Sequence, residues 1–180
     1  MPLKRTSPRQ RLPALLAAAA WLLGSGCDPA EDNKLSAVKR AGEIVVLTRN
    51  SPTTYYEGPD GPTGFEYDLA RAFADSLGVI LHMKTADRFS DILPMIARDE
   101  ADFAAAGLTI TALRAEQVRF TPHYQTIRQQ VIHHAKTTRP TDVKGLVGRH
   151  IEVIAGSSYL ERLEQLRTQY PQLTWMTVGN

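Results

Sequence analysis

Arg114 ends a short segment, TITALR at residues 109–114, whose residue types suit the capture of a small anion. A carboxylate ligand needs a fixed cation and a few oriented N–H or O–H donors. The planar guanidinium of arginine offers a fork that matches the two carboxylate oxygens, and charge-assisted hydrogen bonds of this kind are the stronger ones. We therefore take Arg114 as a candidate ligand-binding residue. A solvated surface arginine on a helical turn is the alternative reading of this residue by itself.

A second anion-binding candidate is the turn Gly156-Ser157-Ser158, which opens a predicted helix. The first turn of a helix presents free N–H groups and a partial positive charge, which suits an anion. A plain helix cap accounts for the same residues, because serine is a preferred N-cap. Ser158 and Glu161 also have the spacing of a capping box, with Ser158 as the cap.

The elements that would position these residues alternate between strand and helix. Short runs rich in β-branched residues predict strands, and apolar residues at helical spacing predict helices between them. The inward face of the first helix is predicted to carry Leu69, Phe73, Ala74 and Leu77. This alternation indicates a parallel sheet covered by helices on both faces. Ligands bind such sheets at the carboxyl ends of the strands, where residues 49–51 and 107–109 fall. The predicted elements are strand 43–48, helix 65–77, strand 79–83, helix 89–98 and strand 102–105.

A second unit is predicted to begin near Gln130. It would open with a strand at Val131 and Ile132 and continue through a short turn or helix at residues 142–146. The later elements are a strand at 150–154, a helix with Leu160, Leu163 and Leu166 at helical spacing, and a strand at 174–178.

The beginning of the chain reads as a secretory signal. Four basic residues precede an apolar run at residues 12–23, and Gly24-Ser25-Gly26 lies before Cys27. We predict a signal peptide at residues 1–26 and a polar tether at residues 27–34. Cys27 is a candidate for acylation, as in a lipoprotein, which would anchor the domain to a membrane face without spanning it. An ordinary signal with a coincidental cysteine and an uncleaved tethering helix are the alternatives.

Composition excludes several functional classes. The chain has 21 basic and 19 acidic residues, and loss of the four signal-region cations leaves 17 against 19, a net charge of −2. Nucleic-acid binding is not expected, because it requires a clustered basic face. The single cysteine precludes an internal disulfide. His123, His133 and His134 have no Cys, Asp or Glu at metal-ligand spacing. We therefore predict no metal, no cofactor and no catalytic residue within these 180 residues.

The stretch at residues 64–124 resembles the family of periplasmic solute-binding proteins that capture amino acids and similar small polar ligands. GFEYDLA, DILPMIARDEADFAAAGLTIT and ALRAEQVRFTPHY carry the resemblance. It implies an α/β, two-lobed fold of the periplasmic-binding-protein type, with a parallel-sheet first lobe and a truncated second lobe. Lobe I would comprise residues 35–129, and residues 130–180 would form a partial lobe II. The ligand-binding residues that the resemblance and the motifs predict are Arg114, Thr109, Gly107, Ser158, Ser157, Tyr56 and Asn50.

The resemblance also assigns roles to these residues. Arg114 would hold the α-carboxylate of the ligand, and the backbone of Gly107 and the hydroxyl of Thr109 would donate to it. Ser158 would contact the same carboxylate from the second lobe. An aromatic residue of the first loop, Tyr56 or Tyr55, would cover the ligand. A tyrosine that packs only on its own loop is the alternative for the last position.

Within this fold, three segments are similar to the N-terminal module of the membrane-bound lytic murein transglycosylase F family. They are TRNSPTTYYEG at 48–58, ADFAAAGLTIT at 101–111 and the run from Gly148 to Trp175. The resemblance implies a module that binds amino acids or muropeptides and regulates a lyase that cleaves peptidoglycan to 1,6-anhydromuramic ends. The lysozyme-like catalytic domain of that family is not among these 180 residues. The second lobe would also lack strands and one of the two hinge crossings, so weak or no ligand binding is expected of these residues alone. A periplasmic location at a membrane, the outer rather than the inner one, is also implied. The alternatives are an amino-acid receptor of an ABC transporter and a structural adaptor with a degenerate pocket.

Overall fold

A parallel three-stranded sheet forms the centre of the first lobe. The computed structural model describes residues 33–179, so the predicted signal peptide, Cys27 and most of the predicted tether lie outside the described residues. The strands are β1 (Glu43–Thr48), β4 (Ile80–Thr85) and β5 (Phe103–Ala104), in the order β4-β1-β5. Val46 in the central strand pairs with Met83 on one side and with Phe103 on the other. The predicted parallel sheet is confirmed, and residues 49 and 105 follow its carboxyl ends.

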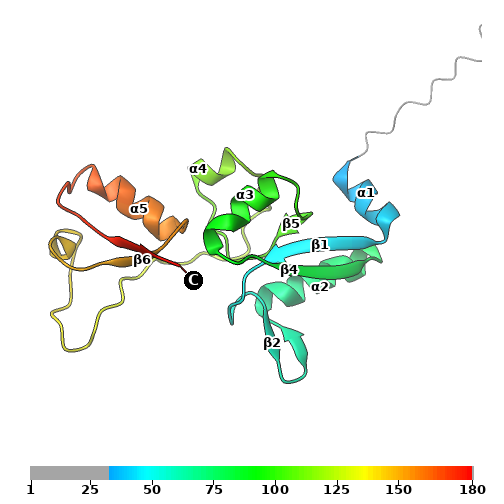
Figure 1. Cartoon of the computed structure of the whole chain (residues 1–180), viewed down its shortest axis with the longest axis horizontal. Helices are drawn as coiled ribbons and strands as arrows, with labels where there is room; N and C mark the ends of the chain where they lie inside the picture. The colour runs from blue at the N-terminus through cyan, green and yellow to red at the C-terminus, as the bar shows by residue number, and fades with distance from the viewer. Residues whose placement is uncertain (1–32, 180) are drawn as a thin grey trace, which may run out of the picture. The chain divides into compact units, whose positions relative to one another are not determined.

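Helices cover both faces of this sheet (Figure 1). On one face, Leu47 packs with the 3-10 helix η1 (Phe89–Asp91) and with α3 (Ile92–Ala97). On the other face, Ile44 packs with α1 (Lys34–Ala41) and α2 (Phe65–Leu77). Ile44 and Leu47 lie on opposite faces because successive side chains of a strand point in opposite directions. The α1 helix falls where the sequence predicted the end of the tether and the start of lobe I.

The buried face of α2 differs from the prediction. Leu69 and Phe73 are 46% and 44% exposed, whereas Glu66, Ala70 and Ala74 are buried. The buried residues recur every four positions and so lie on one face of the helix. Periodicity predicted the helix, its end before Gly78 and the inward positions of Ala74 and Leu77, but it was wrong for Leu69 and Phe73.

A small hairpin lies between β1 and α2, where the sequence predicted only a loop. It consists of β2 (Tyr56–Gly58) and β3 (Gly61–Thr63), which pair antiparallel (Figure 1). Gly64 follows it with a φ of 134°, and a Cβ at this position would lie 2.3 Å from the carbonyl oxygen of Thr54. Only glycine fits this close approach, which directs the chain from the hairpin into α2.

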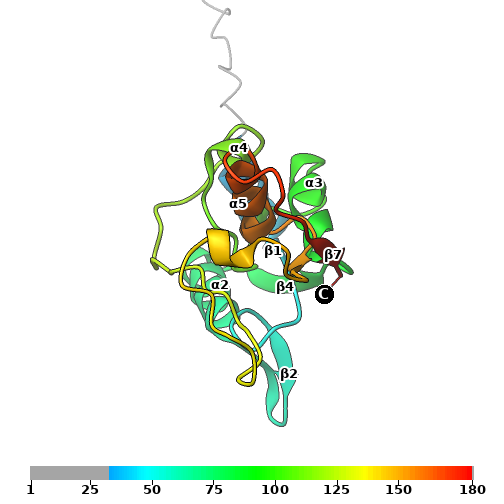
Figure 2. The ribbon, with the colours of Figure 1, turned by 90° about the vertical axis from the view of Figure 1, so that its left-hand side faces the viewer.

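The second lobe contains a two-stranded parallel sheet, β6 (Glu152–Ile154) and β7 (Met176–Val178). The helix α5 (Ser158–Arg167) connects these strands and packs on β6 (Figures 1 and 2). The helix α4 (Ala112–Ala115) and the 3-10 helix η2 (Lys144–Leu146) complete the described elements. The predicted strand at Val131 and Ile132 is wrong. This segment pairs with no strand among the described residues, and Ile132 is 95% exposed. Two β-branched residues do not make a strand where no neighbouring strand supplies hydrogen bonds.

Replacement of Ile92 by alanine is expected to destabilise the first lobe by about 2–5 kcal/mol, because a fully buried side chain leaves a cavity when it is shortened. Ile80→Ala is the matched control, since Ile80 is 65% exposed and its loss is expected to cost well under about 1 kcal/mol. Urea unfolding of both variants measures the difference. Equal midpoints for the two variants would contradict the assignment of Ile92 to the core.

Candidate ligand-binding site

Arg114 is the most deeply buried charged residue described, with 2% of its side chain exposed. It lies on α4, whose N-cap Thr111 accepts a hydrogen bond from the backbone N–H of Arg114 at 3.3 Å. The guanidinium donates from Nε to Glu161 Oε1 at 2.7 Å, from Nη2 to the carbonyl of Gly156 at 2.9 Å and from Nη1 to the carbonyl of Thr109 at 3.3 Å. The alternative of a solvated surface arginine is therefore wrong.

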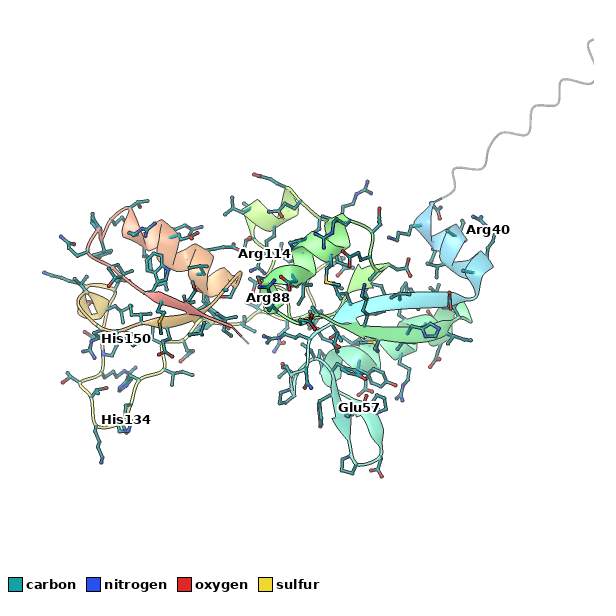
Figure 3. All side chains as sticks on the ribbon, viewed as in Figure 1. Arg40, Glu57, Arg88, Arg114, His134 and His150 are labelled. Atoms are coloured by element: carbon teal, nitrogen blue, oxygen red, sulfur yellow. The ribbon has the colours of Figure 1, made fainter. Side chains whose placement is uncertain are left out.

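These contacts join the two lobes. Arg114 and Thr109 belong to the first lobe, whereas Gly156 and Glu161 belong to the turn and the first turn of α5 in the second. Figure 3 labels Arg114 where the ribbons of the two lobes meet. An arginine suits this position because its donors point in several fixed directions, so that one side chain can bind a carboxylate and two carbonyls at once.

The side chain of Glu161 is only partly satisfied. It is 18% exposed, and its Oε1 pairs with Arg114, but its Oε2 is buried with no hydrogen-bond partner among the described residues. The predicted capping box is wrong. Ser157, not Ser158, is the N-cap of α5, and its hydroxyl accepts from the backbone N–H of Leu160 at 3.3 Å. Glu161 reaches across to Arg114 instead, because an ion pair is a stronger interaction than the second half of a capping box.

A chain of side-chain hydrogen bonds runs beside this ion pair. Gln129 Nε2 donates to Ser158 Oγ at 3.3 Å, and Ser158 Oγ donates to Thr109 Oγ1 at 3.1 Å. Thr109 and Ser158, which were predicted to bind a ligand from opposite lobes, thus bond to each other. The hydroxyl proton of Thr109 has no acceptor among residues 33–179, so it remains available to a further acceptor.

The lobes approach each other closely at Gly156. A Cβ built on this residue would lie 2.8 Å from Ser90 Cα and 2.9 Å from Ser90 Cβ. Its φ of 71° lies in the left-handed region. Two reasons therefore require glycine at position 156: its backbone conformation and its close contact with η1. The approach brings the carbonyl of Gly156 within reach of Arg114.

Sequence reasoning missed two residues that accompany Arg114. They are Phe89 and Arg49. The Cζ atom of Arg49 lies 5.0 Å from the centroid of the Phe89 ring, and the Cζ atom of Arg114 lies 6.0 Å from the same centroid. Such cation–π contacts attract an arginine to an aromatic face. The Nε of Arg49 is buried without a hydrogen-bond partner among the described residues. Its position directly after β1 placed residue 49 at the ligand-binding edge of the sheet, but the sequence did not indicate that Arg49 shares an aromatic ring with Arg114.

Gly107 takes part in a separate contact at the same end of the sheet. Its backbone N–H donates to Glu66 Oε2 at 2.7 Å, and the Tyr124 hydroxyl donates to Glu66 Oε1. Burial, followed by the hydrogen bond to Glu66, raises the pKa of Tyr124. Glu66 is buried and lies in the first turn of α2, where the helix dipole favours its negative charge. In the described structure, the N–H of Gly107 is therefore bonded within the first lobe, to Glu66.

The remaining predicted residues lie apart from Arg114. Tyr56 is part of the β2–β3 hairpin, which Figure 3 marks with Glu57, and Asn50 is an exposed residue bridged to Tyr55. The ring centroids of Tyr55 and Tyr67 are 5.8 Å apart, and the hydroxyl of Tyr55 donates to Glu57. The hydrogen bond to Glu57, followed by burial, raises the pKa of Tyr55. Within residues 33–179, no hydrogen bond, ion pair or ring contact connects Tyr56 or Asn50 to Arg114.

Two further features of the described residues bear on function. Residues 33–179 hold no group of three or more His, Cys, Asp or Glu residues placed to bind a metal ion. Over the same residues, every helix is too short or too polar to cross a bilayer.

The arrangement of two sheets joined at a polar contact agrees with the comparison to protein families. Residues 43–174 match the bacterial extracellular solute-binding proteins, family 3. The chain belongs to this family. The match covers residues of both lobes of the solute-binding chain, because it begins with β1 and extends past α5.

Relatives of this solute-binding chain include much longer proteins. It is 42% identical over 163 residues to a membrane-bound lytic murein transglycosylase F of Ectopseudomonas mendocina, and 40% identical over 161 residues to one of Saccharophagus degradans. Each alignment covers 89% of this chain, but only 33% and 32% of the relative. The chain thus spans about a third of the length of these relatives.

Solved structures confirm the two-lobed fold of this family member. An ancestral arginine-binding protein bound to glutamine matches it with a TM-score of 0.67 and 27% identity, over 77% of this chain and 61% of that one. An amino acid ABC transporter substrate-binding protein from Streptococcus pneumoniae, bound to L-arginine, matches with a TM-score of 0.66 and 25% identity. That match covers 82% of this chain and 62% of that one.

Replacement of Gly156 by alanine in this solute-binding chain is expected to disrupt the contact between the lobes. The new Cβ would clash with the backbone of Ser90, in addition to the strain of about 1–2 kcal/mol that a side chain meets at positive φ. Gly148→Ala separates these effects, because Gly148 has a φ of 78° but nothing within 4 Å of its Cβ position. Urea unfolding should show a larger loss of stability for Gly156→Ala. Equal losses would mean that the contact with Ser90 contributes nothing.

Proposed function

We propose that this chain is the solute-binding and regulatory module of a membrane-bound lytic murein transglycosylase, and that it binds amino acids or muropeptides through a carboxylate held by Arg114. The observation that carries the proposal is the burial of Arg114 at the junction of the lobes, beside hydroxyls from both of them. A buried guanidinium among preorganised donors is the environment in which a carboxylate is bound strongly, because little solvent remains to compete.

Thr109 and Ser158 are proposed to donate to the same carboxylate, one from each lobe. The turn at Ser157, with the free N–H groups that open α5, adds a partial positive charge on the second-lobe side. Gly107, Asn50 and Tyr56 remain proposed ligand contacts on the first lobe. For Gly107 this role requires its N–H to exchange Glu66 for the ligand.

The relatives support a role in cell-wall turnover. The two lytic murein transglycosylases are about 40% identical to this chain across both lobes, which exceeds its identity to the amino-acid-binding proteins. We therefore place the module in the periplasm at a membrane, the outer one rather than the inner one. It would be attached through acylated Cys27 and the tether at residues 27–34, after removal of the signal peptide at residues 1–26. Peptidoglycan would be contacted by a lysozyme-like domain outside these 180 residues, and that domain would carry the lyase chemistry.

The second candidate function is an amino-acid receptor of an ABC transporter. The observation that favours it is the fold of neighbours solved with arginine or glutamine bound. The open reading frame distinguishes the two candidates. We expect it to continue past Asn180 into a lysozyme-like domain, and zymography of the encoded protein on peptidoglycan to show lytic activity. Adjacent permease and ATPase genes with no such continuation would support the receptor instead.

Replacement of Arg114 by lysine is expected to weaken ligand binding by about 10-fold or more, because at least one charge-assisted hydrogen bond, worth ~1.5–3 kcal/mol, is lost with the planar fork. Lysine keeps the positive charge next to Glu161, whereas alanine would leave that carboxylate buried and unpaired. Calorimetry of the whole protein with L-arginine, L-glutamine and muropeptides measures the effect.

Arg119→Lys is the control, since Arg119 is exposed and lies five residues further along the chain. It is expected to bind as the unaltered protein does. Unchanged affinity of the Arg114→Lys variant would refute the proposed role of Arg114.

A further inference from the structure

We propose that Glu161 is a built-in competitor of the ligand: its carboxylate occupies on Arg114 the position that a ligand carboxylate takes, so that binding exchanges one carboxylate for another. The inference rests on the proposed function, because it concerns regulation of the same site. Glu161 and Arg114 are separated by 47 residues and come from different lobes, so the tertiary fold alone brings them together.

The geometry of the pair shows that it leaves room for a better partner. Glu161 bonds Arg114 through one oxygen only, at 2.7 Å from Nε, and its Oε2 is buried without a partner among the described residues. A buried carboxylate oxygen without a hydrogen bond has lost its hydration without gaining a partner in exchange. A ligand carboxylate that finds partners for both oxygens avoids this cost and can replace Glu161.

A donor for the second oxygen is already in place. The hydrogen-bond chain from Gln129 through Ser158 ends at Thr109, whose hydroxyl proton has no acceptor among residues 33–179. The carbonyl of Thr109 accepts from Arg114, so this residue lies directly beside the guanidinium. A carboxylate bound there would accept from Arg114 with one oxygen and from the Thr109 hydroxyl with the other. Glu161 does not make the second of these bonds.

The local charge also favours an incoming anion. Two guanidiniums, those of Arg49 and Arg114, contact the ring of Phe89, and Glu161 is the one acid paired with either of them in the described structure. The buried Nε of Arg49 is unpaired there. The cluster thus carries more positive than negative charge, and an anion lowers its electrostatic energy even while Glu161 remains nearby. Displacement of Glu161 is feasible because it lies in the first turn of α5 and is already partly exposed.

Two functional consequences follow from this exchange. The ligand must carry a carboxylate, because an uncharged amide cannot replace Glu161 on the guanidinium. Its apparent affinity scales with the fraction of molecules in which Glu161 has left the site, so that half-occupancy of the module requires a higher ligand concentration. Release of Glu161 also removes an ion pair between the lobes, which provides a way to signal occupancy.

The first experiment replaces the competitor by a free carboxylate. In the whole protein, Glu161→Ala removes the carboxylate from Arg114, and sodium acetate supplies another. We expect acetate to raise the melting temperature of this variant by about 2–4 °C relative to sodium chloride of the same ionic strength. Acetamide, the uncharged analogue, should have no effect. If the Glu161→Ala variant folds only in acetate, this outcome also supports the inference, because acetate would then be essential for its stability.

Glu164→Ala is the matched control, because Glu164 lies on the same helix and is exposed. Neither this variant nor the unaltered protein is expected to respond specifically to acetate. The inference is overturned if Glu161→Ala fails to respond to acetate, if it fails to fold even in acetate, or if all three proteins respond equally.

The second experiment separates this inference from the proposed function. By calorimetry with L-arginine, L-glutamine and muropeptides, Glu161→Gln is expected to bind at least about 10-fold more tightly than the unaltered protein, because the competing charge is gone. Weaker binding would show that Glu161 contacts the ligand rather than competing with it, and would overturn the inference. If no compound binds either protein but acetate still stabilises Glu161→Ala, the proposed function fails while the competition for Arg114 stands.

Discussion

The ion pair between Arg114 and Glu161 is the interaction on which the joining of the two lobes depends. Arg114 is buried and Glu161 is partly buried, and the same guanidinium also binds the carbonyl of Gly156 in the second lobe. Loss of one partner of a buried pair costs about 3–5 kcal/mol, because the other charge is left without compensation in a medium of low polarity. Mutation of either partner is therefore strongly destabilising. Glu161 can still be exchanged for another anion, since an incoming carboxylate replaces the lost partner.

The rest of the junction supports this pair. Gly156 allows the backbone of the second lobe to approach Ser90, and Phe89 offers its ring to the guanidinium. The hydroxyls of Thr109 and Ser158 bond to each other across the same contact. Groups that would bind a ligand are therefore satisfied by one another in the described state. A ligand must offer better partners than these to bind, because the existing hydrogen bonds have to be broken first.

Membership in the solute-binding family explains the two sheets but not the biological role, because one fold can serve transport, sensing and the regulation of enzymes. The distinction depends on what the chain is joined to. For a transporter receptor, closure of the lobes is read by a permease. For a module of a lytic enzyme, a change in the contact between Arg114 and Glu161 would be transmitted to a domain in the same polypeptide.

By itself, the sequence determined the parallel sheet of the first lobe, the helix that ends before Gly78 and the polar turn at Gly156, because hydrophobic periodicity and glycine positions are local properties of the chain. It also identified Arg114, Thr109 and Ser158 as a set, and the structure brings these three together. Only the tertiary structure decided that Glu161 pairs with Arg114 instead of capping α5, and that Leu69 faces outward. Both outcomes depend on which surfaces meet across the fold, and spacing along one helix carries no information about a partner 47 residues away.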